Sequence, residues 1–436
     1  MTYAELWESL VEPSDRSPAA VAELARTMRE RKVTFGDRPH CPFLRPFFLD
    51  AADETRVRVA GEAIAAIGER VIEASLADPA LLAQVGLTEA EERLVRIDPG
   101  YKRASTASRL DSFLLPDSLM FAEYNAESPA GLGYSQTLGE IFAALPLMDR
   151  FRKQHRAETR PIMESMLEAL LASYKDWGGT ANPPQIAIVD WKEVPTYTEF
   201  EILRDRFERL GVPTLIADPR DLVFSGGALT AHGKKIDLVY RRVLVNDILA
   251  KPAECQALID AYSARAVCVA NTLRCKIPHK KAFFAVLHDE RNQHLFSGAE
   301  REIIRRHIPV THVVNERVAE SARGRRENLV LKPSDEYGGA GVFLGWELTS
   351  SQWDEALQRA VTDAGKVWIV QERIPVRREE FPMFTVDASV TRKEMLVDFS
   401  PYFFRGKACG YLTRLSATGL ANVTSGGGQA PAFVVS

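Results

Sequence analysis

A strand–helix–strand unit is the sequence feature that most constrains the fold of this chain. Gln185–Asp190 and Thr214–Ala217 are short apolar runs typical of buried strands, and Ile236–Tyr240 is a third. The segment between the first two has helical spacing, and Thr198 with Glu201 predicts a capping box at the start of that helix. Because strands joined by a helix run parallel, we expect a small parallel sheet with helices on its faces.

The length of the chain leaves room for further units around this sheet. With 436 residues, two or three packed units are expected. Asp53–Leu76 repeats apolar residues at three- and four-residue spacing, which predicts a helix within an N-terminal helical region. The Gly- and Pro-containing segment Trp177–Pro184 is the expected boundary before the α/β unit.

Charge and composition exclude several classes of protein. The net charge is -4 and the isoelectric point is about 6.1, so the surface offers no general basic field for nucleic acid. Apolar runs end before the roughly 18–20 residues that a membrane span needs, and the acidic N-terminal segment is unlike a signal peptide. The five cysteines are scattered without a C-x-x-C pair, which favours reduced thiols in a cytoplasmic protein.

The most informative segment for chemistry is Asn328–Val342. An apolar strand ends at Lys332, and Glu336 precedes a turn that contains Gly338 and Gly339. Glycines let backbone N–H groups approach phosphate oxygens, and the lysine adds a positive charge for the same phosphates. A Gly-rich hairpin with a surface lysine explains the segment equally well when it is considered alone.

Two strands predicted at residues 108–114 and 119–125 carry polar side chains on common faces. Glu123 and Asn125 are two residues apart, so their oxygens lie side by side and suit magnesium, unless they form a solvated polar pair. Arg109 and Asp111 share a face in the same way. Arg109 could clamp a substrate carboxylate, and an internal ion pair with Asp111 is the equally economical alternative.

Three weaker signals lie elsewhere in the chain. A strand that ends in Gln371 and Glu372 could offer its backbone to adenine and its carboxylate to ribose. Arg242 follows a strand end, where ligands of parallel sheets bind. Arg414 precedes the glycines Gly426–Gly428, which could close over phosphates, although composition alone favours a flexible surface loop.

In this order the motifs resemble those of circularly permuted ATP-grasp proteins, in particular eukaryotic-type glutathione synthetase and glutathionylspermidine-synthase-like ligases. The resemblance covers the chain from about Arg109 to Gly428. It implies an α+β, ATP-grasp fold with an inserted small α/β substrate domain. The implied divisions are an N-terminal helical region at 1–100, the first part of the ATP-grasp domain at 101–182, the substrate domain at 183–275, and the rest of the ATP-grasp domain at 276–436, with a lid at about 323–365.

The resemblance also implies a role for each candidate residue. ATP would be held by Lys281, Lys332, Gly338, Gly339, Gln371, Glu372 and Gly427, and two magnesium ions by Glu123, Asn125 and Glu336. Arg109, Arg242 and Arg414 would serve catalysis by orienting the acid and balancing charge. Whether Lys280 or Lys281 contacts ATP stays open, because one residue along a helix turns the side chain by about 100°.

The implied reaction joins a carboxylate to an amine at the expense of ATP, through an acyl phosphate. Small-molecule acids and amines or amino acids are the expected partners, and a homodimer is a further expectation because the family often forms dimers. Ala130 replaces a serine that glutathione synthetase carries, and Tyr337 interrupts the glycine run, which weakens the case for glutathione as product. A small-molecule kinase and a non-catalytic nucleotide- or peptide-binding module remain alternatives, and the presence of both Glu123 and Glu336 argues for an enzyme.

Overall fold

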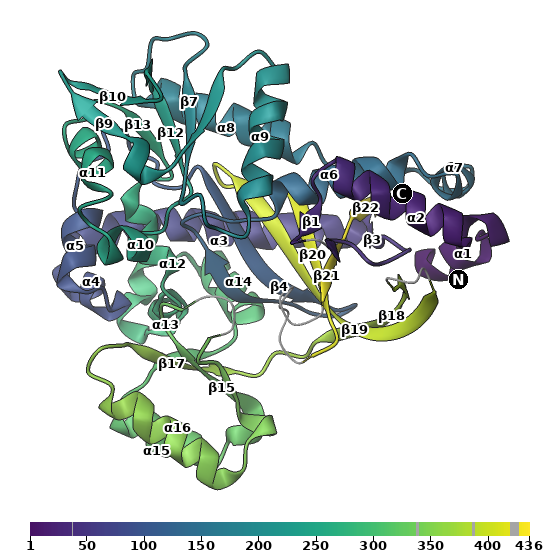
Figure 1. The fold of residues 1–436 in the computed structure, drawn as a ribbon. Coiled ribbons are helices and arrows are strands. Elements are labelled where there is room, and N and C mark those ends of the chain that lie inside the picture. The colour runs from purple at the N-terminus through teal and green to yellow at the C-terminus, as the bar shows by residue number, and fades with distance from the viewer. Residues whose placement is uncertain (37, 337–339, 386–388, 419–426) are drawn as a thin grey trace.

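Three hydrophobic cores organise the protein. The largest lies around the central sheet and the N-terminal helices and extends to one face of an upper sheet, the second lies on the other face of that sheet, and the third lies in a small subdomain. The computed structural model describes residues 1–36, 38–336, 340–385, 389–418 and 427–436. A parallel α/β sheet lies at the top of Figure 1, a long antiparallel sheet crosses the middle, and a small subdomain projects below. The mixed α+β class expected from the sequence is therefore confirmed.

The helices and strands have the following bounds. The helices are α1 (Tyr3–Ser9), α2 (Pro18–Glu30), α3 (Ala51–Ala77), α4 (Pro79–Val85), α5 (Glu89–Val95), α6 (Leu132–Ala143), α7 (Pro146–Arg152), α8 (Ile162–Asp176), α9 (Tyr197–Arg209), α10 (Val245–Ala250), α11 (Gln256–Ser263), α12 (Lys276–His279), α13 (Ala282–His288), α14 (Gly298–His307), α15 (Glu316–Arg323) and α16 (Ser350–Thr362). The strands are β1 (Thr34–Phe35), β2 (Arg38–Pro39), β3 (Phe47–Asp50), β4 (Ala107–Leu114), β5 (Leu119–Asn125), β6 (Ala157–Glu158), β7 (Ile186–Val189), β8 (Thr214–Ala217), β9 (Val223–Ser225), β10 (Ala228–Ala231), β11 (Lys234–Lys235), β12 (Leu238–Arg241), β13 (Cys268–Ala270), β14 (Thr311–Val313), β15 (Leu329–Pro333), β16 (Phe343–Leu344), β17 (Trp368–Glu372), β18 (Arg377–Phe384), β19 (Val390–Phe404), β20 (Lys407–Ser416), β21 (Gly428–Ala430) and β22 (Ala432–Val435).

The central sheet joins strands from distant parts of the chain. Its order is β21-β20-β19-β4-β5, and β18 pairs with the far end of β19. The junction is antiparallel and sets Tyr402 of β19 opposite Arg109 of β4. The two residue pairs that the sequence singles out on β4 and β5 therefore lie in one sheet with β19, β20 and β21 near the end of the chain.

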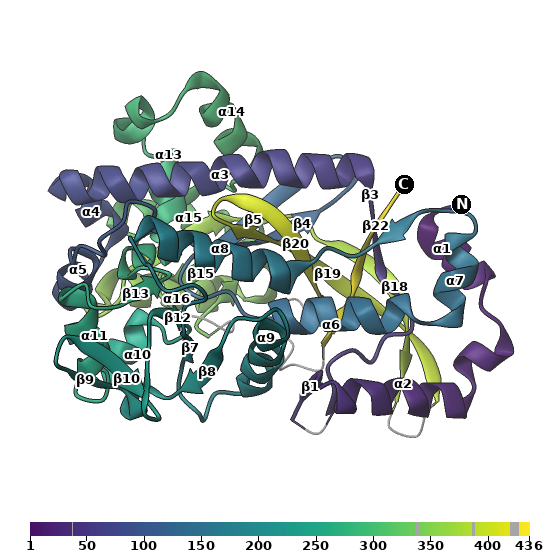
Figure 2. The same ribbon diagram turned by 90° about the horizontal axis from the view of Figure 1, so that it is seen from above.

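The N-terminal region is mainly helical and supports this sheet. Its longest helix, α3, runs beside the central sheet and packs on β19 and β20 (Figure 2). The N-terminal region also contributes β3, which pairs in parallel with β22 near the C-terminus. Over the described ranges, no helix combines the length and apolar character needed to cross a bilayer.

The upper sheet has the parallel topology predicted from the sequence. Its order is β13-β12-β7-β8, all neighbours are parallel, and its central strand β7 is fully buried. The predicted capping box is wrong in detail. The helix α9 begins at Tyr197, and its N-cap residue Thr196 makes no side-chain capping bond.

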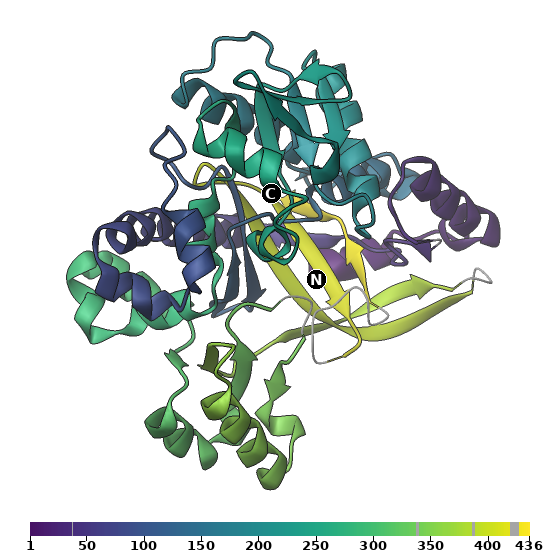
Figure 3. The ribbon, with the colours of Figure 1, turned by 60° about the vertical axis from the view of Figure 1, so that its left-hand side comes forward.

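The small subdomain has a core of its own. Strands β14, β17, β15 and β16 form an antiparallel sheet, and α15 and α16 pack on it around Trp353 and Leu331. Figure 3 shows the subdomain projecting below the central sheet. It contains the predicted lid at about 323–365, whose motion stays a prediction.

The contact of α3 with the central sheet generates a stability prediction. A Cβ atom at Gly61 would lie 2.1 Å from the ring of Phe403, a residue that is fully buried and has no room to turn away. We expect Gly61→Ala to lower the free energy of unfolding by about 1–3 kcal/mol, because overpacking outweighs the gain in helix propensity. The measurement is the urea unfolding midpoint followed by circular dichroism.

Gly324→Ala is the matched control for this prediction. A Cβ atom there meets nothing within 4 Å, and the residue has a negative φ of -76°. The control should shift stability by no more than about 0.5 kcal/mol. Equal midpoints for both variants would contradict the close approach of α3 to β19.

Candidate functional site

Strand β4 places Arg109 and Asp111 side by side in the interior of the central sheet. Arg109 Nε donates to Asp111 Oδ1 at 2.7 Å, Nη2 donates to Oδ2 at 3.1 Å, and Nη1 donates to the Ala130 carbonyl at 2.8 Å. Burial favours the protonated form of Asp111, but the guanidinium groups of Arg109 and Arg414 hold its pKa well below the usual range. The internal ion pair left open by the sequence thus forms in the structure.

Arg414 on β20 extends this pair into a network. The register pairs Arg414 with Asp398 of β19, and Arg414 Nη2 contacts both Asp398 Oδ2, at 2.6 Å, and Asp111 Oδ2. Burial raises the pKa of Asp398 to about 6 against the opposing charge of Arg414. The network therefore crosses β4, β19 and β20.

Strand β5 places Glu123 and Asn125 on the same face of the sheet. Asn125 Nδ2 donates to Glu123 Oε1 at 3.3 Å, so the two side chains lie side by side as the two-residue spacing predicts. Lys281, at the junction of α12 and α13, brings its Nζ within 3.4 Å of Glu123 Oε2. A cation thus already neighbours the carboxylate.

Strand β15 brings Lys332 to this group from the small subdomain. Lys332 Nζ donates to Gln371 Oε1 of β17 at 2.8 Å, and Gln371 Nε2 donates to Thr311 Oγ1 at 3.0 Å. Burial lowers the pKa of Lys332 to about 8, with Glu123 raising it and Lys281 lowering it. The pKa of Lys332, in the small subdomain, thus depends on the charges of Glu123 in the central sheet and of Lys281 beside it.

The loop after β15 holds Glu336 beside this cluster. Its carbonyl accepts from Lys281 Nζ at 2.6 Å, whereas its carboxylate pairs with Lys366 of the small subdomain. The predicted phosphate-binding glycines Gly338 and Gly339 lie outside the described residues.

Glu372 and Gly427, two of the remaining candidates, have other partners. The Glu372 carboxylate is 3.1 Å from Arg325 Nη2 at the surface. The carbonyl of Gly427 accepts from Arg38 Nη1 at 3.4 Å. Within the part of the chain that the structure describes, neither of these two contacts involves another predicted site residue.

The two arginines at the end of β12, Arg241 and Arg242, occupy different environments. Arg241 is buried and donates to the Val243 carbonyl at 2.6 Å, with Glu127 Oε2 3.4 Å away. Arg242 Nη1 donates to the Pro129 carbonyl at 2.6 Å, and Nη2 lies 3.6 Å from Glu199 Oε2. Arg242 therefore reaches the loop after β5 that leads away from Glu123 and Asn125.

Several charged residues of this region were not singled out in the sequence. Asp398 stands within the apolar run of β19, and such a buried charge in a strand is the signal that could have found it. Asp335 contacts Lys276 and Lys280. The adjacent lysines Lys280 and Lys281 therefore have different partners. Lys281 faces Glu123, whereas Lys280 faces Asp335.

The oxygen atoms that the protein supplies suit magnesium only when a bound phosphate compound supplies further oxygen atoms. Across the described parts of the chain, His, Cys, Asp and Glu side chains nowhere gather in a group of three able to hold a metal ion. Glu123 and Asn125 supply hard oxygen atoms, and magnesium is commonly bound by one or two carboxylates together with substrate phosphates. The donor set therefore fits magnesium that arrives with a phosphate ligand.

The central cluster has an excess of positive charge. It consists of the cations Arg109, Arg414, Lys281 and Lys332 and the carboxylates Asp111, Asp398 and Glu123. Cations that outnumber buried carboxylates favour a bound anion. The arrangement can thus hold a polyphosphate close to a paired carboxylate and amide.

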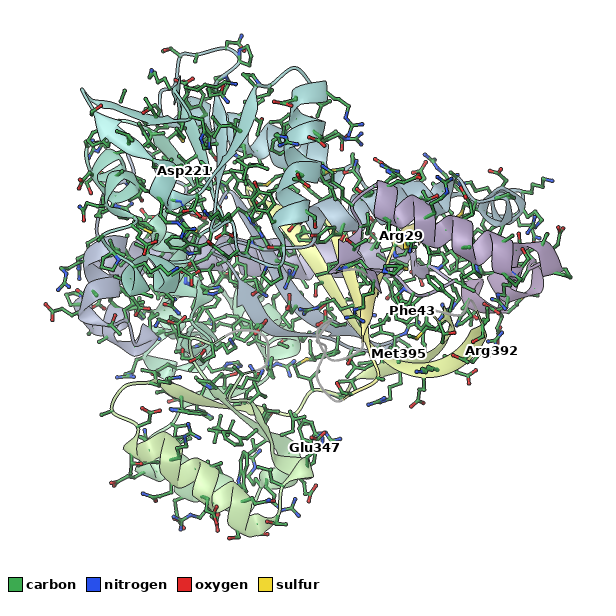
Figure 4. All side chains as sticks on the ribbon, in the orientation of Figure 1. Arg29, Phe43, Asp221, Glu347, Arg392 and Met395 are labelled. Atoms are coloured by element: carbon green, nitrogen blue, oxygen red, sulfur yellow. The ribbon has the colours of Figure 1, made fainter. Side chains whose placement is uncertain are left out.

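A separate cavity of about 1170 Å³ lies between α1, β3 and β18. Its charged residues pair with one another, as Arg45 does with Glu379 at 2.9 Å and Arg392 with Glu8 at 2.6 Å. Figure 4 shows Arg392 on the β18–β19 arm, far from Glu347 in the small subdomain. The residues that line this cavity include none of the predicted site residues.

The overall architecture also occurs in a solved structure. The structure is similar to that of a glutathione synthetase like-effector from Globodera pallida, with a TM-score of 0.65 and 12% identity over 98% of this chain and 99% of that one. A putative gamma-glutamylcysteine synthetase from Methylobacillus flagellatus gives a TM-score of 0.38 and 12% identity over 82% of this chain and 83% of that one. No curated protein matches the sequence. Residues 111–423 match the family described as circularly permuted ATP-grasp type 2, and the chain belongs to that family.

Proposed function

We propose that this protein is an ATP-dependent ligase that joins a carboxylate to an amine. Membership in an ATP-grasp family supports ATP-dependent ligase activity at the coarse level. The observation that carries the proposal is the position of Lys281. Its Nζ lies 3.4 Å from Glu123 Oε2 of the central sheet and donates at 2.6 Å to the carbonyl of Glu336, in the loop that follows the strand of Lys332. Such a group can hold a triphosphate between two parts of the protein.

In this proposal the phosphates of ATP lie among the lysines. Lys332 would leave Gln371 Oε1 for a phosphate oxygen, and Lys281 would balance a second phosphate beside Glu123. Gln371 and Glu372 at the end of β17 would face adenine and ribose, and Gly338, Gly339 and Gly427 would approach the phosphates. Charge neutralisation and positioning are the main contributions a protein makes to phosphoryl transfer.

Magnesium would be held by Glu123, Asn125 and Glu336, with two ions as the expected number. When bound, the metal neutralises phosphate charge and aligns the γ-phosphate. The Glu336 carboxylate now pairs with Lys366, so Glu336 must exchange that partner to take this role. Closure of the segment at about 323–365 over the nucleotide is the proposed movement.

The chemistry has two steps. A carboxylate oxygen of the acid attacks the γ-phosphorus, the bond to the β–γ bridging oxygen breaks, and ADP leaves. The nitrogen of the amine then attacks the acyl carbon, phosphate leaves, and the nitrogen loses a proton as the amide forms. Exclusion of water matters because an acyl phosphate hydrolyses in its presence.

Arg242 and Arg109 are the proposed partners of the acid. Arg242 contacts the Pro129 carbonyl and Arg109 contacts the Ala130 carbonyl, so both guanidinium groups reach the same loop. Because a guanidinium binds a carboxylate through two parallel hydrogen bonds, this loop is the expected place of the acid. Arg414 would stabilise charge on the transferred group.

A single assay separates this function from the two alternatives. Purified protein is incubated with Mg-ATP and pools of amino acids, other carboxylic acids and polyamines, while ADP and new masses are followed. ADP with an amide product supports the ligase, and ADP with a phosphorylated product supports a kinase. Nucleotide binding without ADP formation in any pool would favour a binding module.

Glu336→Gln tests the magnesium assignment. We expect turnover to fall at least about 100-fold with the fold intact, because the variant loses the charge that would bind the metal. Glu347→Gln is the control, since Glu347 is exposed on the same subdomain. Circular dichroism checks folding, and an unchanged rate in Glu336→Gln would remove Glu336 from the site.

The lowered pKa of Lys332 predicts a pH dependence of nucleotide binding. Lys332 has a pKa of about 8 and is charged below that value, so affinity for ATP should fall as pH rises from 7 to 9. Above pH 8 the loss should approach about tenfold per pH unit. Calorimetry at pH 8 in buffers of different ionisation enthalpy should show uptake of about half a proton on binding.

Lys332→Arg is the matched variant for this pH series. Arginine stays charged throughout the range, so its nucleotide affinity should be nearly constant between pH 7 and 9. A wild-type affinity that does not change over this range would show that the Lys332 ammonium does not contact the phosphates.

A further inference from the structure

The segment Ser334–Glu336, which leaves the small subdomain, is fastened to the body of the protein by several bonds. The Lys281 N–H donates to the Ser334 carbonyl at 2.8 Å, and the Ala282 N–H donates to Ser334 Oγ at 3.1 Å. Lys281 Nζ donates to the Glu336 carbonyl at 2.6 Å. These three hydrogen bonds join the loop that carries Glu336 to the junction of α12 and α13.

Asp335 provides the charged part of this attachment. Lys276 Nζ lies 2.6 Å from Asp335 Oδ1, and Lys280 Nζ lies 2.6 Å from Oδ2. Because each carboxylate oxygen takes a different ammonium group, the plane of the carboxylate is fixed. Asn246 of α10 adds a longer contact of 3.4 Å from its Nδ2 to the Asp335 carbonyl.

The two lysines are themselves held from behind by buried carboxylates. Lys280 Nζ lies 2.8 Å from Glu91 Oε1, and Lys276 Nζ lies 3.5 Å from the same oxygen and 3.7 Å from Glu127 Oε1. The side chains of Lys276 and Glu127 are 1% and 0% exposed. Buried carboxylates therefore hold the two lysines in place, and the lysines in turn hold the Asp335 carboxylate.

This network reaches both predicted parts of the metal site. Glu127 follows Asn125 by two residues, and its Oε2 accepts from the Val245 N–H at 2.9 Å. Asp335 directly precedes Glu336. In Figure 1, α10, α12 and α13 lie between the upper sheet and the small subdomain, where this link is needed.

The charges of the network persist at neutral pH. Burial favours neutral Asp335, but Lys276 and Lys280 keep its pKa well below the usual range. Burial also lowers the pKa of Lys276, but the charges of Glu127, Asp335 and Glu91 raise it above the usual value. Asp335 and Lys276 thus stay charged.

We infer that Asp335 is a positioning residue that holds Glu336 and Lys281 in register with Glu123 and Asn125, so that the binding of nucleotide with magnesium depends on it. The inference rests on the proposed function, because it assumes that these residues bind magnesium and ATP. Asp335 acts through its neighbours and does not contact the ligand. Its loss should therefore weaken the contribution of magnesium more than the contribution of the Lys332 ammonium.

The experiment compares nucleotide binding with and without magnesium. The dissociation constant of a non-hydrolysable ATP analogue is measured by calorimetry on the whole chain, once in EDTA and once in saturating magnesium. We expect Asp335→Asn to reduce the tightening caused by magnesium at least about tenfold, the size typical of losing a residue that orients metal ligands. Affinity in EDTA should stay within about threefold of the wild type.

Glu379→Gln is the matched control. Glu379 is a carboxylate of similar exposure that also pairs with two cations, Arg45 at 2.9 Å and Arg377 at 2.5 Å, beside the separate cavity. It should lower the unfolding temperature as Asp335→Asn does and leave the effect of magnesium unchanged. Asp335→Glu keeps the charge and should recover part of the magnesium effect.

The outcomes separate the two levels of the proposal. If Asp335→Asn does not fold, Lys280→Gln removes one of the two ammonium partners and should shift the magnesium effect in the same direction. An unchanged magnesium effect in the folded variant, with the wild type responding to magnesium, would overturn the positioning role alone. A wild type that binds no nucleotide would overturn the proposed function and this inference with it.

Discussion

The buried network of Arg109, Asp111, Arg414 and Asp398 is the interaction on which the central sheet depends. Arg414 and Asp111 are 303 residues apart in the sequence, yet they are ion-paired inside one sheet. Removing one member of a buried pair costs about 3–5 kcal/mol, because the remaining charge is left without compensation. The four residues that join β4 to β19 and β20 are also four of the seven charged residues of the central cluster.

The ion pairs within the sheet already occupy hydrogen-bond donors that a ligand would otherwise use. Two N–H donors of Arg109 are hydrogen-bonded to Asp111, so a substrate acid would bind a guanidinium whose orientation Asp111 already sets. Lys332 and Lys281 are less constrained, with partners that a phosphate oxygen could replace. The site thus combines a fixed anionic and cationic frame in the sheet with two lysines that can change partners.

Much of the fold could be predicted because local patterns and tertiary structure agree. The apolar run Thr214–Ala217 matches β8 residue for residue, and the two-residue spacing of Glu123 and Asn125 places both on one face of β5. The capping box predicted at Thr198 is wrong, because the helix begins at Tyr197 and Thr198 therefore lies inside its first turn. Spacing also left the partner of Arg109 open, since either a ligand or Asp111 satisfies a guanidinium.

The residues that the sequence did not reveal are those whose meaning depends on distant partners. Asp335 lies between two residues of the predicted motif, but nothing local indicates that Lys276 and Lys280 converge on it. Asp398 acquires its role only when β20 brings Arg414 opposite to it. These contacts form between residues that are far apart in the sequence, and the local spacing of apolar and polar residues does not predict them.

The long separation between β4 and β19 has a consequence for how the protein is made. When the ribosome has completed the upper sheet, whose last strand ends at Ala270, the central sheet still consists only of the β4–β5 hairpin. Arg109 and Asp111 then have each other but not Arg414, and the hairpin edge that will receive β19 is exposed. Because domains fold as units during synthesis, the upper sheet can become stable early, whereas the central sheet closes only near the end of translation. One edge of β4 therefore stays unpaired for most of synthesis and could pair with a wrong strand during that time. In a sheet built from strands that are consecutive in the sequence, each edge would be paired soon after its synthesis.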